Sequence, residues 1–261
     1  MSDQTLISNR TCKHLIWKSL VYLVILLVVV LLMSLTGCGT VWTWRDACTE
    51  TYMQALLEQA SNGNAASQCS LGVCYFDGHG VAQNHTNAVM WFRKSAEQGN
   101  ADGQCKLAAC YYHGDGVTQD YTNAVNWYRK AAEQGNAKGQ FNLGYCCYYY
   151  GDGIEQDYTN AVNWYRKAAE QGNAEAQCGL GVCYFDGHGV VRNYTKAVKW
   201  FRKSAEQDNA DGQFGLGFCY YHGDGVPKQR RTALKWLRKA ANHEHDHAHD
   251  DTQDFLQKVT L

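Results

Sequence analysis

The chain has a single proline among its 261 residues, and its charges nearly cancel. Twenty-four lysines and arginines stand against 25 acidic residues, which gives a formal net charge of −1. One proline argues against a long disordered linker. The balanced charge argues against nucleic acid as a partner, because such binding needs a clustered positive face. The sequence also contains no Ser-x-x-Lys, so it lacks the signature of penicillin-recognising enzymes.

A repeated unit accounts for most of the chain. Its clearest mark is a tryptophan that recurs after 36 residues, or once after 37, at Trp91, Trp127, Trp164, Trp200 and Trp236. The extra residue falls in the tyrosine-rich stretch 145–150 of the third copy. Repetition at a fixed period of roughly 20 to 50 residues is the signature of a solenoid. No His, Cys or acid stands outside this pattern as a nucleophile or base would, so we predict no catalytic residue and no cofactor.

The second half of each unit predicts an amphipathic helix. In the first copy, Ala88, Trp91, Phe92, Ser95 and Ala96 follow the spacing of one helical face. A short polar residue four positions before that alanine can accept a hydrogen bond from an open backbone N–H. Four copies have such a capping residue and the fifth has glutamine: Asn84, Asp120, Asp157, Asn193 and Gln229.

The first half of each unit predicts another helix, on which Gln68, Leu71, Gly72 and Tyr75 share one face. A glycine inside a helix costs about 1 kcal/mol relative to alanine, so Gly72 indicates a close approach between helices. A Gly-x-Gly then ends the helix, because glycine adopts the left-handed conformation that follows many helix ends. This motif recurs at 78–80, 114–116, 151–153, 187–189 and 223–225.

One unit cannot bury its own apolar faces, whereas stacked units can. We therefore predict an all-α fold: a right-handed α/α superhelical solenoid with capping helices, preceded by an N-terminal hydrophobic helix. Its five repeats cover 63–98, 99–134, 135–171, 172–207 and 208–243. We expect two segments to cap them: a helix at 51–62 that keeps only part of the repeat pattern, and a His/Asp-rich segment with a terminal helix at 244–261.

These residues carry a family resemblance. Leu-Gly-x-x-Tyr, followed by Gly-x-Gly-Val and then Ala-x-x-Trp-Tyr-x-Lys-Ala-Ala, resembles the Sel1-like repeat family, a relative of the tetratricopeptide repeats. The resemblance covers 63–243. It implies an α/α superhelix that serves mostly as an adaptor, and it names no partner.

The first 37 residues predict a signal peptide or membrane segment. Residues 20–33 are nearly all aliphatic, but these 14 residues are fewer than the about 20 that a membrane-spanning helix needs. Residues 35–38, Leu-Thr-Gly-Cys, resemble the lipobox of bacterial lipoproteins, which implies lipidation of Cys38 and a tether at 38–50. An uncleaved single-pass anchor that also uses Leu15–Trp17 is the alternative. Both place the protein in the bacterial cell envelope, and Gly39 favours the outer over the inner membrane by analogy.

Twelve cysteines in an exported chain raise the question of disulfides. Cys69 and Cys74 lie five residues apart on one helix, about 8–9 Å between Cα atoms, which exceeds the roughly 7 Å that a disulfide spans. A bond between repeats, such as Cys74 to Cys105, stays open. Burial as small apolar residues is favoured, because Phe141 and Phe214 fill the same position in other copies. The bridging cysteine of cysteine-rich relatives is replaced here by Ala96, Ala132, Ala169, Ala205 and Ala241, so their disulfide pattern is not carried over.

Histidines offer a candidate metal site. The tract 243–251 alternates histidine with acidic residues, and neutral imidazoles at this density bind Zn, Ni or Cu. His243, His245, His247 and His249 are the candidate ligands for a divalent metal. A solvated insertion before the terminal helix is the alternative. His and Asp also recur beside the Gly-x-Gly turns, as at 77 and 79, where a polar turn is the favoured explanation.

On one face of the first helix the residue types differ between copies, whereas those of the buried stripe do not. This pattern is typical of a surface that is available for contact with a partner. The predicted partner-binding residues are Ser70, Val73, Asp77, Lys106, His113, Asn142, Tyr145 and Phe218. In tetratricopeptide-like superhelices the first helix lines the concave side, so the resemblance makes Tyr145 and Phe218 the best anchors. The alternative is that both rings fill local gaps.

The leading hypothesis is a membrane-tethered scaffold that binds a protein or peptide on its concave face. A hydrolase of β-lactams or of the cell wall, as reported for some cysteine-rich relatives, is one alternative. A periplasmic metal-binding protein that uses the histidine tract is the other.

Overall fold

The structure, a computed structural model of the 261-residue chain, describes residues 44–149, 153–243, 252–253 and 255–257. Three predictions lie outside these residues: the signal segment 1–37, the lipidation of Cys38, and His245, His247 and His249 as metal ligands. The chain divides into two compact units, Met1–Glu50 and Thr51–Leu261, and the second holds the repeats. No helix in the described ranges combines the length and the apolar character needed to cross a membrane.

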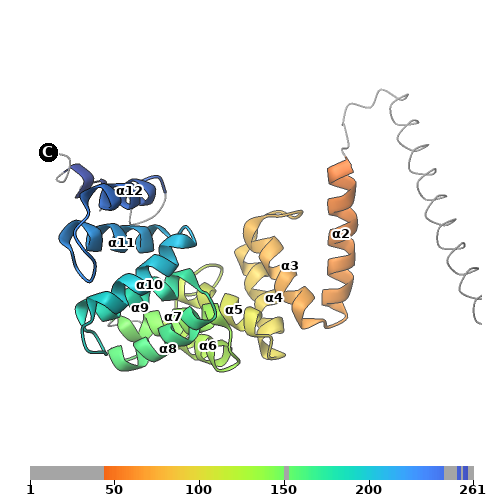
Figure 1. Cartoon of the computed structure of the whole chain (residues 1–261). Coiled ribbons are helices and arrows are strands. Elements are labelled where there is room, and N and C mark those ends of the chain that lie inside the picture. The colour runs from red at the N-terminus through yellow and green to blue at the C-terminus, as the bar shows by residue number, and fades with distance from the viewer. Residues whose placement is uncertain (1–43, 150–152, 244–251, 254, 258–261) are drawn as a thin grey trace, which may run out of the picture. The chain divides into compact units, whose positions relative to one another are not determined.

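Helices α3 to α12 form one pair for each predicted repeat (Figure 1). The first helices of the pairs are α3 (Ala65–Asp77), α5 (Ala101–His113), α7 (Ala137–Tyr148), α9 (Ala174–Asp186) and α11 (Ala210–His222). The second helices are α4 (His85–Glu97), α6 (Tyr121–Glu133), α8 (Tyr158–Glu170), α10 (Tyr194–Glu206) and α12 (Arg230–Ala240). Each helix contacts the next, and the first helices also contact one another in order. The described residues contain no strand, and the all-α solenoid is confirmed.

A nearly constant apolar seam joins the two helices of each pair. The stripe predicted on α4 is buried, from Ala88 to Ala96. The mid-helix glycine lies against a ring of the second helix: a Cβ atom added at Gly72 would sit 2.5 Å from Phe92. This confirms the predicted close approach of the helices. One leucine of each first helix is at most 2% exposed, at Leu71, Leu107, Leu143, Leu180 and Leu216, and each contributes roughly 1.5–3 kcal/mol by its burial.

The second helices begin where the capping residues predict. Asn84, Asp120, Asp157 and Asn193 each accept a hydrogen bond from the backbone N–H three residues further on. Gln229, in the fifth repeat, makes no such bond. The cap therefore satisfies one open N–H group in four of the five second helices.

The Gly-x-Gly turns also join neighbouring repeats. Gly114 ends α5 with a left-handed φ of 82°, as predicted. Gly116 packs against the start of α4, where an added Cβ would lie 2.3 Å from the carbonyl of His85. The second glycine of the turn thus allows a close contact with the preceding repeat that a larger residue would block.

The N-terminal cap differs from its prediction. Helix α2 (Trp44–Ser61) begins within the predicted tether rather than at Thr51. Leu56 and Ala60 are buried, whereas Ala55, which precedes Gly63 by eight residues as Trp91 precedes Gly99, is exposed. This helix has almost no amphipathic pattern, so its start could not be placed from periodicity. At the other end of the chain, residues 252–253 and 255–257 are helical, where a terminal capping helix is predicted.

Buried glutamines connect the helices of the first four repeats. We define the glutamine ladder as Gln68, Gln104, Gln140 and Gln177 with their partners Gln98, Gln134, Gln171 and Gln207. Each first-helix glutamine donates from Nε2 to a backbone carbonyl of the preceding helix at 3.0 to 3.2 Å. Each also accepts from Nε2 of its partner at 2.7 to 2.8 Å. Both ends of the buried amide are therefore paired, which avoids the cost of an unmet hydrogen bond.

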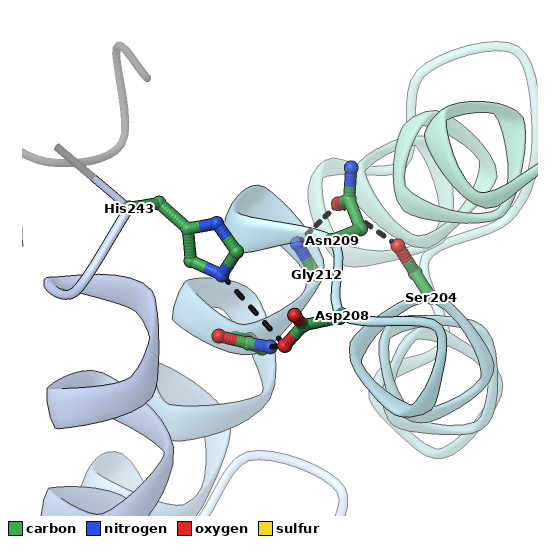
Figure 2. Close-up of polar contacts among 6 residues, drawn as sticks. Ser204, Asp208, Asn209, Gly212 and His243 are labelled. Atoms are coloured by element: carbon green, nitrogen blue, oxygen red, sulfur yellow. Dashed lines mark hydrogen bonds and ion pairs between the residues drawn. The ribbon is translucent and has the colours of Figure 1, made fainter. Parts of the chain in front are cut away.

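The fifth repeat replaces the ladder with another arrangement, which Figure 2 shows. Asp208 stands where the other repeats have glycine, and it alone among the described non-glycine residues has a positive φ, 64°. Its carboxylate accepts from Nε2 of Gln213 at 2.7 Å and lies 3.7 Å from Nε2 of His243. His243 takes the place of the ladder partner, and Oε1 of Gln213 is buried without a hydrogen-bond partner.

Candidate partner-binding groove

A cleft of about 670 Å³, which we call the groove, lies along the first helices of repeats three to five. Its walls come from α7, α9 and α11, and rings of α8 and α10 contribute to its floor. The groove residues are Phe141, Tyr145, Tyr149, Tyr165, Glu175, Cys178, Gly179, Val182, Phe185, Asp186, Phe201, Asp211, Phe214, Gly215 and Phe218. This volume is in the range of pockets that hold ligands.

Aromatic side chains follow one another along the walls. On the α7 side, Tyr145 lies between Phe141 and Tyr149, with ring centroids 6.3 and 4.4 Å away. Tyr145 and Tyr149 keep 37% and 46% of their surface exposed. Across the groove, Phe218 of α11 lies 5.9 Å from Phe185 of α9. Such rings offer a partner a large contact area at a low cost in conformational entropy.

Two glycines give the groove its depth. Gly179 and Gly215 take a helix position that holds Ser, Lys and Asn in the first three repeats. A Cβ atom at Gly179 would lie 3.1 Å from the ring of Tyr165, and one at Gly215 would lie 2.9 Å from that of Phe201. Because these positions have no side chain, the groove reaches down to both rings.

The groove carries negative charge. Glu175 and Asp211 lie in the first turns of α9 and α11, and Asp186 is the last residue of α9. All three are exposed. The described lining residues include no lysine, arginine or histidine. Burial raises the pKa of Tyr149, and the neighbouring Tyr145 and the charge of Asp211 raise it further, so its hydroxyl stays protonated at neutral pH.

Comparison with known proteins identifies the repeat. The family model described as Sel1 repeat matches five consecutive segments, residues 65–100, 101–136, 137–173, 174–209 and 210–245. The chain belongs to the Sel1 repeat family. Sel1 repeat proteins are generally scaffolds for protein–protein interactions.

Solved structures of Sel1 repeat proteins share the fold. The chain is similar to a Sel1 repeat protein from Oxalobacter formigenes, with 30% identity and a TM-score of 0.72 over 84% of this chain and 94% of that one. It is also similar to a protective antigen of uropathogenic Escherichia coli strains, with 34% identity and a TM-score of 0.68. That match covers 82% of this chain but 45% of the antigen. No curated protein matches the chain.

The Sel1 repeats bring only part of the predicted partner surface together. Tyr145 and Phe218 line the groove. Phe218 is half-buried rather than exposed, and its ring lies 4.3 Å from that of His222 and 5.5 Å from that of Phe255 in the terminal segment. His113 and Asn142 line a smaller cleft of about 200 Å³, which shares Phe141 and Tyr145 with the groove. The other predicted residues are lining residues of neither cleft: Ser70, Val73, Asp77 and Lys106.

The groove also contains rings for which the sequence favours a packing role. Phe141 and Phe214 fill a position that holds cysteine in the other Sel1 repeats. Each lies four residues before another ring, at Tyr145 and Phe218. Residues four apart are neighbours on one helical face, so this spacing is the signal that could have identified both as walls of a binding surface.

The cysteines of the Sel1 repeats do not supply a reactive thiol. The nine whose side chains are described are free, and all except Cys74 are buried. Burial raises the pKa of Cys105 to about 11 and those of Cys183 and Cys219 to about 12. The nucleophilic thiolate is therefore scarce at neutral pH. The favoured prediction of burial is confirmed for the other eight and not for Cys74, and Cys74 and Cys105 are both free thiols.

Metal binding by the histidine tract stays a prediction. His243 is the one candidate ligand that the structure describes, and the Oδ1 atom of Asp208 lies 3.7 Å from its Nε2 atom (Figure 2). Within the described part of the chain, no three His, Cys, Asp or Glu side chains are grouped as a metal site would require.

Proposed function

We propose that this Sel1 repeat protein is an interaction scaffold of the bacterial cell envelope, and that it binds a segment of a protein partner in the groove. The observation that supports this site is the exposure of Tyr145 and Tyr149 beside buried rings. Exposed tyrosines offer both apolar contact area and a hydroxyl for hydrogen bonding, which is why they are enriched at interfaces. The general role of Sel1 repeat proteins as protein scaffolds supports the same proposal.

The proposed tether is a lipid on Cys38, supported by the Leu-Thr-Gly-Cys of residues 35–38. Several acyl chains would hold the protein stably at a membrane, since one chain alone binds only marginally. Mass spectrometry of the protein from a bacterial membrane fraction tests this part. We expect a mature N-terminus at acylated Cys38, and an intact Met1 would contradict the tether.

A pull-down from envelope extract, followed by affinity measurement on the captured protein, tests the groove. Tyr145→Ala combined with Tyr149→Ala should weaken capture at least tenfold, because each hot-spot ring contributes about 1 kcal/mol or more. Tyr52→Ala is the matched control, since Tyr52 is an exposed tyrosine on α2 outside the groove. The groove proposal fails if the double variant captures the protein as well as the unchanged chain, or if the control loses it equally.

The two other functions raised by the sequence gain no support from the groove. All the described thiols except Cys74 are buried, and the pKa of Cys74 is raised as well, which disfavours a cysteine nucleophile. A nitrocefin assay on the purified chain tests β-lactam hydrolysis, and we expect no turnover. Calorimetry with Zn²⁺ tests metal binding by the histidine tract, and the absence of heat above the buffer signal would contradict it.

A further inference from the structure

We infer that the segment bound in the groove is cationic as well as apolar, with lysine or arginine on both sides of an aromatic or aliphatic anchor. The inference rests on the proposed function of the groove and adds the chemistry of its partner. Three features of the groove carry it: the position of its acids, the kind of rings it exposes, and the contrast with the first three repeats.

The acids lie at both ends of α9, so they flank the apolar part of the groove. Glu175 is the second residue of this helix and Asp186 is its last. These residues are 11 positions apart, which corresponds to about 16 Å along a helix at 1.5 Å per residue. An extended peptide covers that distance in about five residues. Two basic residues about five positions apart could therefore pair with both ends while the residues between them contact the rings.

The exposed rings favour the same occupant. On the second helices, each repeat tryptophan holds the ammonium of the lysine three residues further on, at 4.0 to 5.0 Å from the ring centre. Tyrosine rings attract cations by the same electrostatic effect. The groove presents Tyr145 and Tyr149, and its described lining contains no basic residue. A basic residue of the partner would contact the exposed ring of Tyr149 in the same way.

The first three repeats show that the fold does not require an acid at the position of Glu175 and Asp211. The helix position of Glu175 and Asp211 holds Ala66, Asp102 and Lys138 in repeats one to three. An acid in a first turn interacts favourably with the helix dipole, yet α3 and α7 form without one. Helix formation therefore does not explain the acid at the position of Glu175, whereas the position of Asp186 also holds an acid, Asp77, in repeat one.

Fluorescence anisotropy with three labelled peptides tests the inference on the full chain in detergent solution. The first peptide, Lys-Leu-Trp-Leu-Ser-Lys, places two basic residues five positions apart around apolar ones. The second has glutamate in place of both lysines, and the third has serine in place of leucine and tryptophan. We expect the first to bind at least tenfold tighter than either other, with the advantage over the glutamate peptide shrinking at high salt. Equal binding of the lysine and glutamate peptides, or binding of neither, would overturn the inference.

Charge variants of the protein provide the second arm of the test. Glu175→Lys installs the residue type that repeat three has at this position, so the helix should still form. It should weaken binding of the lysine peptide at least tenfold. Asp102→Asn is the matched control, because Asp102 is a first-turn acid of α5 outside the groove and should leave binding unchanged. Unchanged affinity in Glu175→Lys would overturn the inference.

The outcomes separate this inference from the proposed function. If the Tyr145→Ala, Tyr149→Ala variant no longer captures a protein that Glu175→Lys still captures, the groove binds protein but does not select positive charge. Unchanged capture by both variants would end both. The molar mass of the chain in solution could instead rise with its concentration and stop doing so in the Tyr145→Ala, Tyr149→Ala variant. That result would show that a second copy of the chain occupies the groove, and it would overturn the inference.

Discussion

Repeats four and five form nearly the same pair of helices but stabilise it with different polar contacts. In repeat four, Gln177 belongs to the glutamine ladder, and Asn193 caps α10. In repeat five, Gln213 bonds to Asp208 instead, and Gln229 does not cap α12. The two first helices nevertheless have the same length of 13 residues.

The comparison of repeats four and five shows which interactions define the repeat. Leu180 and Leu216 are both 0% exposed, and in both repeats a mid-helix glycine lies against a side chain of the second helix. The apolar seam is therefore constant where the ladder and the cap are not. We conclude that the seam determines the fold, while the polar contacts adjust its stability.

The largest effect is expected at alkaline pH, where several buried thiols act together. Burial raises the pKa of Cys183 in repeat four and Cys219 in repeat five to about 12, from an ordinary value of 9.0. The unfolded chain loses these protons first, so their contribution to stability is complete below pH 9 and is lost as the pH rises through about 12. Urea unfolding between pH 8 and 11 should show a falling free energy of unfolding. Cys183→Ala and Cys219→Ala should flatten that fall equally, and an effect in one alone would show that the two sites differ.

Truncating the seam should destabilise both repeats alike. Leu180→Ala and Leu216→Ala each leave a cavity under a fully buried side chain, so each should lower the free energy of unfolding by about 3 kcal/mol. Denaturant unfolding at neutral pH measures both. A gap of more than about 1 kcal/mol between them would mean that the seam is not equivalent in the two repeats.

Removing the buried amide should distinguish the repeats. Gln177→Leu leaves the carbonyl of Ala169 and the amide of Gln207 without their partner, which should cost about 1–3 kcal/mol. Gln213→Leu removes an amide whose Oε1 is already unpaired, so it should cost about 1 kcal/mol less. The same unfolding measurement compares them, and equal losses would contradict the role assigned to the ladder.

The smallest effect should come from restoring the missing cap. Gln229→Asp places a short acceptor before α12, where it can bond to the N–H of Thr232, and should raise the stability by about 0.5–1 kcal/mol. Asn193→Ala, which deletes the cap of α10, is the reverse control and should cost about 1 kcal/mol. No gain in thermal stability from Gln229→Asp would show that this helix end is satisfied in another way.

Most of the fold could be predicted because its signals are local. The spacing of the stripe, the capping residues and the glycine of each turn act within one helix or between adjacent helices. The start of α2 could not be predicted, since Trp44–Ser61 has almost no amphipathic pattern. The glutamine ladder could not be predicted either, because its hydrogen bonds join residues about 30 positions apart, as from Gln98 to Gln68.

The candidate site was predicted only in part, for a physical reason. Tyr145 could be recognised because it varies at a position that faces away from the seam, and its exposure agrees with that. Phe218 was placed on the correct face, but Phe255 covers part of its ring from a segment far along the chain. The depth of the groove depends on the absence of side chains at Gly179 and Gly215. The periodicity of a sequence indicates which side chains share a face, but not where a cleft forms between them.

The one-residue insertion in repeat three has a practical consequence. Helix α7 ends at Tyr148 and α8 begins at Tyr158, so this connection is longer than the others, yet the bond from Gln171 to Gln140 keeps the 2.8 Å found in repeat four. The added length is accommodated between the helices without disturbing their register. The α8 end of this connection, beyond Tyr149 of the groove, is therefore a natural place to splice in an epitope or a fluorescent label while the helices keep their register.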